Sequence, residues 1–416
     1  MSSDKFIEKY NLESPSCIYK LAWSSNKIFN GQTQSCHRVA PDFVSHENYH
    51  NFHNTSSKIE DRILMQNGIW PENREGIGCQ YCKKIEEVGG LSDRNLINND
   101  EVFDDYVPKE IKENPKSLIT SPTILEVHFN NLCNQSCVYC NSKYSSLWEA
   151  EDRKYKTNSK LLKEMEDNKK NYPLMLEAHW QWLKENLQSL RTYNILGGEP
   201  LYQKEFEENI DFFIVNSAPL LNIGIFSNLK IEKNKFIKIL DKMQKLLEEK
   251  KLATITFFCS IDCWGPQAEY IRHGMKLNQW EENFNLILNN YSSIRLTIHS
   301  TLTNLGVDTL EDLCGKVVEW NKIRQVGHTI SIADGVDYLH PNIFRRGFFK
   351  DKIYNIVDNY RDSKIVPQLI GFEKSFDAEQ NIDNLIIELK STLDQLDKRR
   401  NTNWKTLWPW LNEYEV

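Results

Sequence analysis

The sequence predicts an α/β fold in which parallel strands alternate with helices. Six short runs rich in β-branched and aromatic residues follow residue 122, amphipathic helical stretches separate them, and 40% of the 416 residues are hydrophobic, enough for a sizeable core. Strands that alternate with helices pair in parallel through right-handed crossovers. Six units are too few for a complete eight-stranded barrel, so the pattern fits a partial barrel or an open doubly wound sheet.

The expected elements follow from the period of the apolar residues. We expect strands at 123–129, 191–196, 222–227, 253–261, 294–301 and 327–333. Helical patterns cover 208–220, 234–250, 278–291 and 309–323. A charged helical pattern covers 351–398, and the chain then closes with Trp404, Trp408 and Trp410, which we expect to pack against other parts of the fold.

The sequence before the strands has a different character. Residues 1–105 are rich in Asn, Ser, His and Gly with few apolar runs, and 106–121 are charged with two prolines, which is typical of a linker. We therefore expect four parts: a small N-terminal domain at 1–105, a linker at 106–121, the β/α series at 122–340 and a helical C-terminal extension at 341–416.

Charge and hydropathy exclude several classes of function. Lys and Arg number 51 against 58 Asp and Glu, so the net charge of −7 gives no general attraction to nucleic acid. The first twenty residues carry charges of both signs without a continuous apolar stretch, and the most apolar segment, 252–264, is too short to cross a bilayer. We expect a cytoplasmic protein with neither nucleic acid nor membrane as a partner.

The ten cysteines are unevenly distributed. In a long chain without an export signal, thiols stay reduced, and clustered cysteines usually bind metal. Seven of the ten form two groups, namely Cys17, Cys36, Cys79 and Cys82, and then Cys133, Cys137 and Cys140. Both groups are therefore candidate metal sites.

The second group has the spacing C-x-x-x-C-x-x-C and directly follows the strand at 123–129. Loops at strand ends are where β/α folds place their chemistry. Three thiolates leave one iron of a four-iron cluster open, whereas structural zinc takes four protein ligands. The spacing favours a [4Fe-4S] cluster bound by Cys133, Cys137 and Cys140.

This cysteine spacing, with Tyr139 before the last cysteine, resembles that of the radical S-adenosylmethionine (SAM) enzymes. The resemblance implies a partial (β/α)6 TIM barrel and a cluster whose open iron is chelated by SAM. One-electron reduction, by a donor such as a flavodoxin or ferredoxin, would cleave SAM to a 5′-deoxyadenosyl radical that abstracts hydrogen from carbon. The three cysteines would then be the catalytic ligands.

Polar residues at the later strand ends extend the resemblance. The Gly-Gly-Glu after the second strand is similar to the family's GGE motif, which receives the SAM amino group, and the polar pairs after the third and fourth strands are similar to its ribose-contacting residues. The SAM-binding residues that the resemblance implies are Tyr139, Gly197, Gly198, Glu199, Ser227, Asn228, Ser260, Asp262 and Arg272.

The first cysteine group leaves two interpretations open. Structural zinc is one, because C-x-x-C is a common half of a zinc site and His37 follows Cys36. The other is a resemblance to the twitch or SPASM-like domain of radical SAM enzymes, carried by Glu86, Glu87, Gly89, Ser92 and Arg94 after the last cysteine pair. It implies an auxiliary [4Fe-4S] cluster on Cys17, Cys36, Cys79 and Cys82, in a subgroup that often has two adjacent cysteines at the position of Cys36 and His37.

Two further features have alternative interpretations. Strand alternation puts Cys259 and Cys263 on one face, where a thiol could return a hydrogen atom to a substrate radical or simply pack in the core. The spacing of His46, His50 and His53 could bring imidazoles together, but without an accompanying carboxylate pattern we expect them on a solvated surface.

The two resemblances together imply radical modification of a peptide or protein substrate. Radical SAM enzymes that have an auxiliary cluster and resemble this chain are commonly peptide maturases. One alternative is a radical SAM enzyme that acts on a small metabolite. Another is a zinc-stabilised binding protein without catalytic activity, which would require the three-cysteine motif to be inactive.

Overall fold

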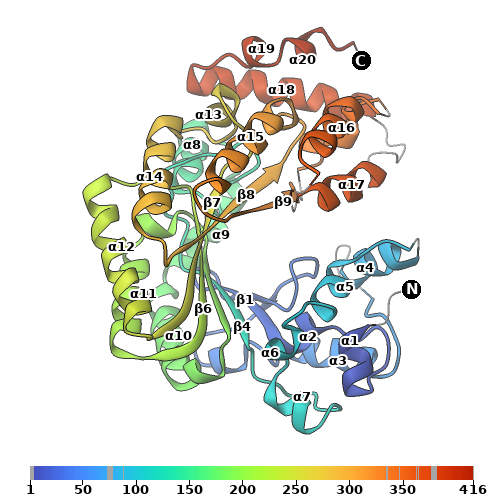
Figure 1. The fold of residues 1–416 in the computed structure, drawn as a ribbon, viewed down its shortest axis with the longest axis vertical. Coiled ribbons are helices and arrows are strands. Elements are labelled where there is room, and N and C mark those ends of the chain that lie inside the picture. Colours follow the sequence, from blue (N-terminus) through green and yellow to red (C-terminus); the bar gives the residue numbers. More distant parts are fainter. Residues whose placement is uncertain are drawn as a thin grey trace. The chain divides into compact units, whose positions relative to one another are not determined.

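The computed structural model describes residues 4–72, 78–87, 89–333, 336–345, 347–361, 363, 365–375 and 382–415. It is a mixed α/β structure whose nine strands follow the order β3-β2-β1-β4-β5-β6-β7-β8-β9 (Figure 1). The strands are β1 Trp23–Lys27, β2 Gln32–Gln34, β3 Asp42–Phe43, β4 Ile124–His128, β5 Thr192–Leu196, β6 Ala218–Ser227, β7 Leu252–Ser260, β8 Arg295–Leu302 and β9 Val326–Ile332.

The helices fall before, between and after the strands. Those before β4 are α1 Lys5–Tyr10, α2 Ile18–Ala22, α3 Ser56–Gln66, α4 Cys79–Glu87, α5 Asp93–Asn98, α6 Phe103–Tyr106 and α7 Lys109–Glu113. Those from β4 to β9 are α8 Ser146–Tyr155, α9 Ser159–Lys169, α10 Tyr172–Asn186, α11 Lys204–Val215, α12 Lys233–Glu248, α13 Pro266–Ile271, α14 Leu277–Asn290 and α15 Leu310–Asn321. The last are α16 Lys350–Asn359, α17 Val366–Ser375, α18 Ile382–Arg400, α19 Trp404–Leu407 and α20 Pro409–Glu413.

All six expected strands are confirmed as β4 to β9, and β4–β5, β5–β6, β7–β8 and β8–β9 pair in parallel as the alternation predicts. One of the predicted helices ends clearly earlier than expected. The helical pattern at 208–220 corresponds to α11, which ends at Val215, and Ala218 already begins β6. The reason is Pro219, which has no backbone N–H to donate and disfavours the helical conformation of the residue before it.

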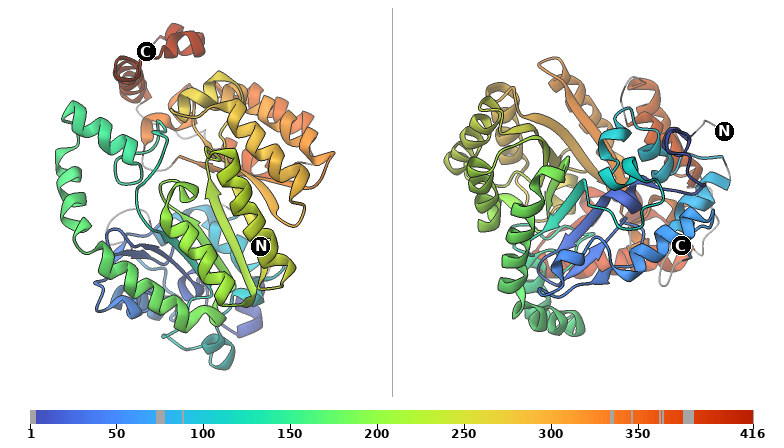
Figure 2. Two further views of the ribbon diagram at one scale, coloured as in Figure 1. Left: turned by 90° about the vertical axis from the view of Figure 1, so that its left-hand side faces the viewer. Right: turned by 90° about the horizontal axis from the view of Figure 1, so that it is seen from below.

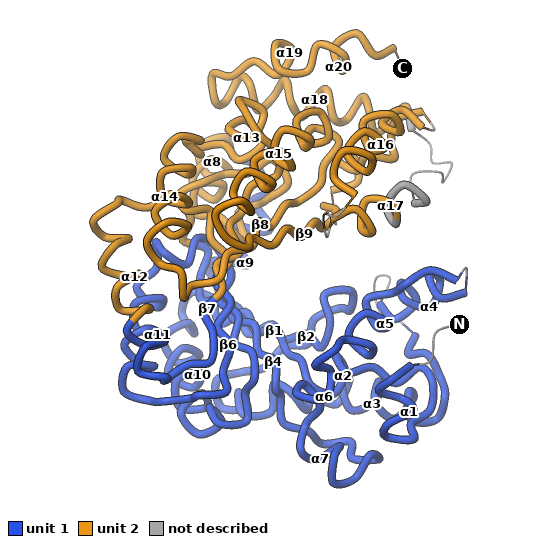
Figure 3. The backbone as a smooth tube through the Cα atoms, in the orientation of Figure 1, with its two compact units in different colours: residues 1–131, 156–225, 245–255 blue, residues 132–155, 226–244, 256–416 orange. Residues whose placement is uncertain are grey.

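The described chain forms two compact units, shown in separate colours in Figure 3. Unit 1 comprises 1–131, 156–225 and 245–255, and unit 2 comprises 132–155, 226–244 and 256–416. Each unit combines segments that are distant along the chain.

Unit 1 contains strands that the sequence analysis did not predict. Strand β1 pairs in parallel with β4, and β2 pairs antiparallel with β1, so the N-terminal segment adds strands to the same sheet. Helix α7 lies within the expected linker, where Ile111 is buried in a core with Phe6 and Ile18. The N-terminal segment therefore has an apolar core, and residues of the expected linker are part of it.

Polar side chains form a second part of the interior of unit 1. His53 is buried, and its ring lies 2.8 Å from Ser24 Oγ and 3.0 Å from the Leu21 carbonyl oxygen. Lys58 Nζ donates to Thr33 Oγ1 at 2.7 Å. The prediction that His53 is solvated is wrong, because neighbours distant in sequence supply the hydrogen bonds that a buried imidazole requires.

Unit 2 contains the C-terminal helices, of which α16 packs against α17, and α19 packs against both α18 and α20 (Figures 1 and 2). Two of the closing tryptophans, Trp404 and Trp408, are almost fully buried, and Trp408 Nε1 donates to the Leu305 carbonyl at 2.9 Å. The expectation that these residues anchor the tail is confirmed. Among the described residues, no helix is both long and apolar enough to span a bilayer.

Candidate active site and cysteine centres

In unit 1, the Gly-Gly-Glu segment forms a tight turn after β5. Gly197 and Gly198 both have positive φ, +83° and +47°, which glycine adopts without strain. A Cβ on Gly197 would stand 2.8 Å from the Cβ of His128 on β4, so the turn approaches that strand closely. Glu199 is 1% exposed, and its Oε1 accepts the Leu201 N–H at 3.1 Å. Glycine is therefore required here for conformation and for space.

In unit 2, the loop that carries Cys133, Cys137 and Cys140 is held by hydrogen bonds to its backbone. Trp148 Nε1 donates to the Cys137 carbonyl at 2.8 Å, and Ser146 Oγ bonds both the Cys133 N–H and the Cys133 carbonyl. Cys133 and Cys137 are both 9% exposed. Burial, together with the nearby Cys137 thiol, raises the pKa of Cys140 to about 12. The loop thus presents three thiols on an ordered backbone.

Three residues that the resemblance implies meet beside this loop. Asp262 is fully buried, and its carboxylate accepts from Arg272 at 2.7 Å, from the Tyr139 hydroxyl at 2.9 Å and from the Thr301 N–H at 2.8 Å. The Arg272 guanidinium carbon lies 5.7 Å from the centre of the Tyr139 ring. Burial opposes the charge of Arg272, but Asp262 outweighs it and raises the pKa of the guanidinium.

This arrangement separates the roles of the two charged groups. The carboxylate of Asp262 is occupied by protein donors, so it orients Arg272 and Tyr139. The Nε of Arg272, in contrast, is buried without a hydrogen-bond partner among the described residues. A buried, charged N–H without an acceptor is costly, so this atom is a candidate for binding an anionic group.

The strand ends that follow β6 and β7 also lie in unit 2. Ser227 Oγ accepts the Leu229 N–H at 3.0 Å, and Asn228 Nδ2 donates to Asn134 Oδ1 at 2.9 Å. Asn228 thereby connects the end of β6 to the cysteine loop. Ser260 is the last residue of β7 and is partly exposed.

Cys259 and Cys263 are both fully buried. Cys259 Sγ lies 3.8 Å from the Phe257 carbonyl oxygen, and burial raises the pKa of Cys263 to about 12. Buried, protonated thiols of this kind act as small apolar side chains, so the structure favours core packing for both.

The four cysteines of the first group, although distant along the chain, line one small cavity in unit 1. Cys17 precedes α2, Cys36 follows β2, and Cys79 and Cys82 lie on α4. The cavity has a volume of about 20 Å³. Three of the four cysteines are buried, and Cys36 is partly exposed. The Sγ of Cys36 accepts the Arg38 N–H at 3.5 Å.

The charges around this cavity are complementary to thiolates. Lys20 is 2% exposed, lines the cavity and donates to Asp61 at 2.5 Å. Burial opposes the charge of Lys20, but Cys79 and Asp61 outweigh it and raise its pKa. Burial in turn raises the pKa of Cys79 to about 11, and Lys20 limits this rise. The sequence analysis missed Lys20, because a lysine in a short amphipathic helix normally faces solvent.

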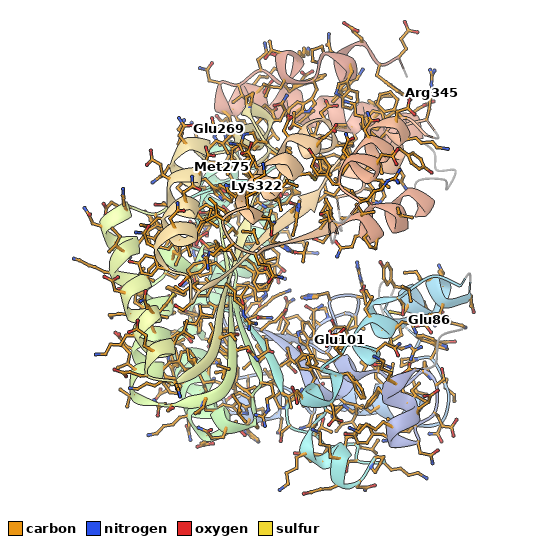
Figure 4. All side chains as sticks on the ribbon, viewed as in Figure 1. Glu86, Glu101, Glu269, Met275, Lys322 and Arg345 are labelled. Atoms are coloured by element: carbon orange, nitrogen blue, oxygen red, sulfur yellow. The ribbon has the colours of Figure 1, made fainter. Side chains whose placement is uncertain are left out.

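Arg94 joins the segments that carry these cysteines. It donates to Glu86 Oε1 at 2.9 Å and Oε2 at 2.6 Å, to Asp4 at 2.6 Å and to the Ser16 carbonyl at 3.2 Å. Glu86, labelled in Figure 4, is on α4 beyond Cys82, and it also accepts from Ser92 Oγ at 2.6 Å. The Glu, Ser and Arg of the sequence pattern thus form one ion-pair network next to the cavity.

The donor sets determine which groups the two sites can hold. Within the described residues, no three Cys, His, Asp or Glu side chains converge closely enough for a single metal ion. Four thiols around one cavity, with a buried cation and a backbone N–H directed at sulfur, are nevertheless the ligands and hydrogen bonds typical of an iron–sulfur cluster. In chemical kind the residues fit such a cluster at both sites.

The chain was compared with protein families, curated proteins and solved structures. No protein-family model matches the chain, and no curated protein matches it. Among solved structures, the chain is similar to the crystal structure of Streptococcus suis SuiB bound to precursor peptide SuiA, with a TM-score of 0.37 and 13% sequence identity. The alignment covers 83% of this chain and 70% of that chain.

Proposed function

We propose that this protein is a radical SAM enzyme, built on a partial (β/α)6 barrel, that modifies a peptide or protein. The observation that carries the proposal is the C-x-x-x-C-x-x-C loop directly after β4, the first strand of a confirmed parallel β/α series. When bound, a [4Fe-4S] cluster and SAM supply a 5′-deoxyadenosyl radical for hydrogen abstraction. Cys133, Cys137 and Cys140 would hold that cluster.

The residues proposed for SAM have chemistry suited to its charged groups. Glu199 offers a carboxylate to an ammonium, and the glycines before it permit close approach of the backbone. Arg272 Nε is an unused donor for a carboxylate, and Asp262 holds the guanidinium and the Tyr139 hydroxyl in place. Ser227, Asn228 and Ser260 complete the set, with polar side chains at the ends of β6 and β7.

In unit 1, the proposed auxiliary [4Fe-4S] cluster would be held by Cys17, Cys36, Cys79 and Cys82. Lys20 would offset part of the negative charge of the four thiolates, and the Arg38 N–H would donate to a ligating sulfur. The proposal also includes a flavodoxin or ferredoxin as the electron donor and a cytoplasmic location.

The first experiment measures iron, sulfide and zinc in protein purified and reconstituted without oxygen. Two [4Fe-4S] clusters give about eight iron and eight sulfide per chain, whereas about four iron with one zinc would reject the auxiliary cluster and keep the catalytic one. Replacing Cys133, Cys137 and Cys140 with alanine is expected to abolish 5′-deoxyadenosine formation. Persistence of that product would refute the catalytic assignment.

The second experiment separates the two sites. The double variant Cys79→Ala, Cys82→Ala should lose the auxiliary absorbance and the turnover of substrate but keep uncoupled cleavage of SAM. Glu199→Gln should keep its iron and bind SAM about ten- to a hundred-fold more weakly, because it loses one charge-assisted hydrogen bond. An unchanged SAM dissociation constant would contradict the role of Glu199.

A further inference from the structure

A second, larger cavity of unit 1 lies next to the four-cysteine cavity. Its volume is about 370 Å³, within the range of about 300–1,000 Å³ that is usual for small-ligand sites. Cys36, Tyr19 and Asp93 line both cavities. A group bound in the larger one would therefore lie beside the proposed auxiliary cluster.

The sheet supplies the polar wall of this cavity. Glu126 on β4 is in register with Ser25 on β1 and with Asn194 on β5, and parallel strands in register direct such residues to the same face. The flanking residues of β4, Leu125 and Val127, are fully buried on the opposite face. The alternation along β4 therefore directs the Glu126 side chain into the cavity, on the face opposite Leu125 and Val127.

One oxygen of the Glu126 carboxylate has an unused acceptor position, although burial is outweighed by His37 and Asn194, which interact with the group and lower its pKa. Glu126 is only 6% exposed, and its Oε2 atom is buried without a hydrogen-bond partner among the described residues. His37 Nε2 lies 3.4 Å from Oε2, within ion-pair reach but longer than an ordinary N–H···O bond, and the His37 side chain is 65% exposed. A buried carboxylate oxygen without a donor is costly unless a ligand supplies one.

The rest of the lining favours a cation. The aromatic residues Tyr19, Trp23 and Tyr106 line the cavity, and their faces attract cationic groups. Two carboxylates, from Asp93 and Glu126, are part of the lining, and the described lining residues include neither Lys nor Arg. Arg38 pairs with Asp93 at 3.3 Å and His37 lies 3.4 Å from Glu126, so each carboxylate has one basic neighbour, but Glu126 Oε2 still has no hydrogen-bond partner among the described residues.

We infer that this cavity binds a cationic side chain of the substrate, a lysine ammonium or an arginine guanidinium, at the Glu126 carboxylate. The inference rests on the proposed function in taking the ligand to be part of a peptide. It makes Glu126 a specificity-determining residue, distinct from the residues proposed to bind SAM and the clusters.

The test measures binding of three capped amino acids to the full-length protein by calorimetry without oxygen. Nα-acetyl-lysine methylamide and its arginine counterpart carry the charge, and Nα-acetyl-norleucine methylamide keeps the lysine chain length without it. The lysine or arginine probe should bind at least ~10-fold more tightly than norleucine, the factor expected for one charge-assisted hydrogen bond. The stronger of the two identifies the cation.

Glu126→Gln, which keeps the shape but removes the charge, should reduce this preference to within about twofold. Glu110→Gln is the matched control, because Glu110 is a half-buried carboxylate of unit 1 that accepts from Ser121 outside the cavity, and it should keep the preference. Norleucine binding as tightly as lysine and arginine in the wild type, no binding of either cationic probe, or a preference retained in Glu126→Gln would each overturn the inference. The first two require no variant to fold.

Iron content and SAM cleavage, measured on the same preparations, separate this inference from the proposed function. Protein that forms no cluster but prefers the cationic probe would refute the proposed function and keep the cation site. Protein that cleaves SAM but binds norleucine as well as lysine would do the reverse.

Discussion

Replacing Arg94 with methionine tests whether its ion-pair network holds the cysteine-bearing segments together. The Arg94 side chain is 5% exposed, and its partners Glu86 and Asp4 are 19% and 14% exposed. The substitution keeps much of the side-chain volume but leaves two mostly buried carboxylates unpaired. Breaking a buried ion pair costs about 3–5 kcal/mol, and the partial exposure of the carboxylates favours the lower end.

A loss of about 3 kcal/mol corresponds to roughly a hundred-fold increase in local opening. Hydrogen exchange followed by mass spectrometry on peptides that cover α1, α4 and α5 measures this directly. The control is Arg361→Met, which removes an ion pair with Asp358 whose side chains are 76% and 61% exposed, and which should leave exchange around α16 unchanged. Less than about a threefold change in the Arg94 variant, or an equal increase along the whole chain, would refute a local, network-based role.

Two further predictions concern unit 1. His179 is buried between the hydroxyls of Tyr49 and Tyr193. Burial lowers its pKa to about 3, whereas the pKa of histidine in an unfolded chain is about 6.5. Between these two pH values the unfolded state therefore binds more protons than the folded state. The stabilisation by neutral His179 is therefore complete above pH 6.5 and falls by roughly 2 kcal/mol on acidification to pH 5. The free energy of unfolding of His179→Gln, measured with urea, should fall less over that range. The same dependence of unfolding free energy on pH in both proteins would contradict this. Gly197→Ala should destabilise the protein by about 1–3 kcal/mol more than Gly89→Ala. Both glycines have positive φ, but only a Cβ at position 197 would stand against His128. Equal unfolding midpoints of the two variants would show that the close approach has no cost.

Much of the fold follows from local pattern. The strands β4 to β9 were predictable because β-branched runs alternate with helical periods, and parallel pairing follows from that alternation. The anchoring of the C-terminal tail was also predictable, because an indole as large as Trp408 is rarely left in water. These inferences require only the neighbours of each residue along the chain.

Other features depend on contacts between distant segments. Strands β1 and β2 are short and polar, and Ser24 and Asn26 are buried only because His53, Tyr49 and Thr33 supply hydrogen bonds. A polar strand and a polar loop have the same local pattern, so the sequence analysis placed no strand there. For the same reason it expected His53 in solvent.

Residue types and their spacing were enough to indicate the kinds of ligand: the three-cysteine loop after the first β/α strand, the Gly-Gly-Glu after the second, and four further cysteines in the N-terminal segment. Folding brings those four together around one cavity and buries Lys20 and Arg94 beside it, which no local pattern indicates. Folding likewise buries the Glu126 carboxylate in the wall of a second cavity. The physical reason is that residue type sets what a side chain can bind, whereas burial and the choice of partner, which set its charge and its cost, depend on segments that meet only when the chain folds.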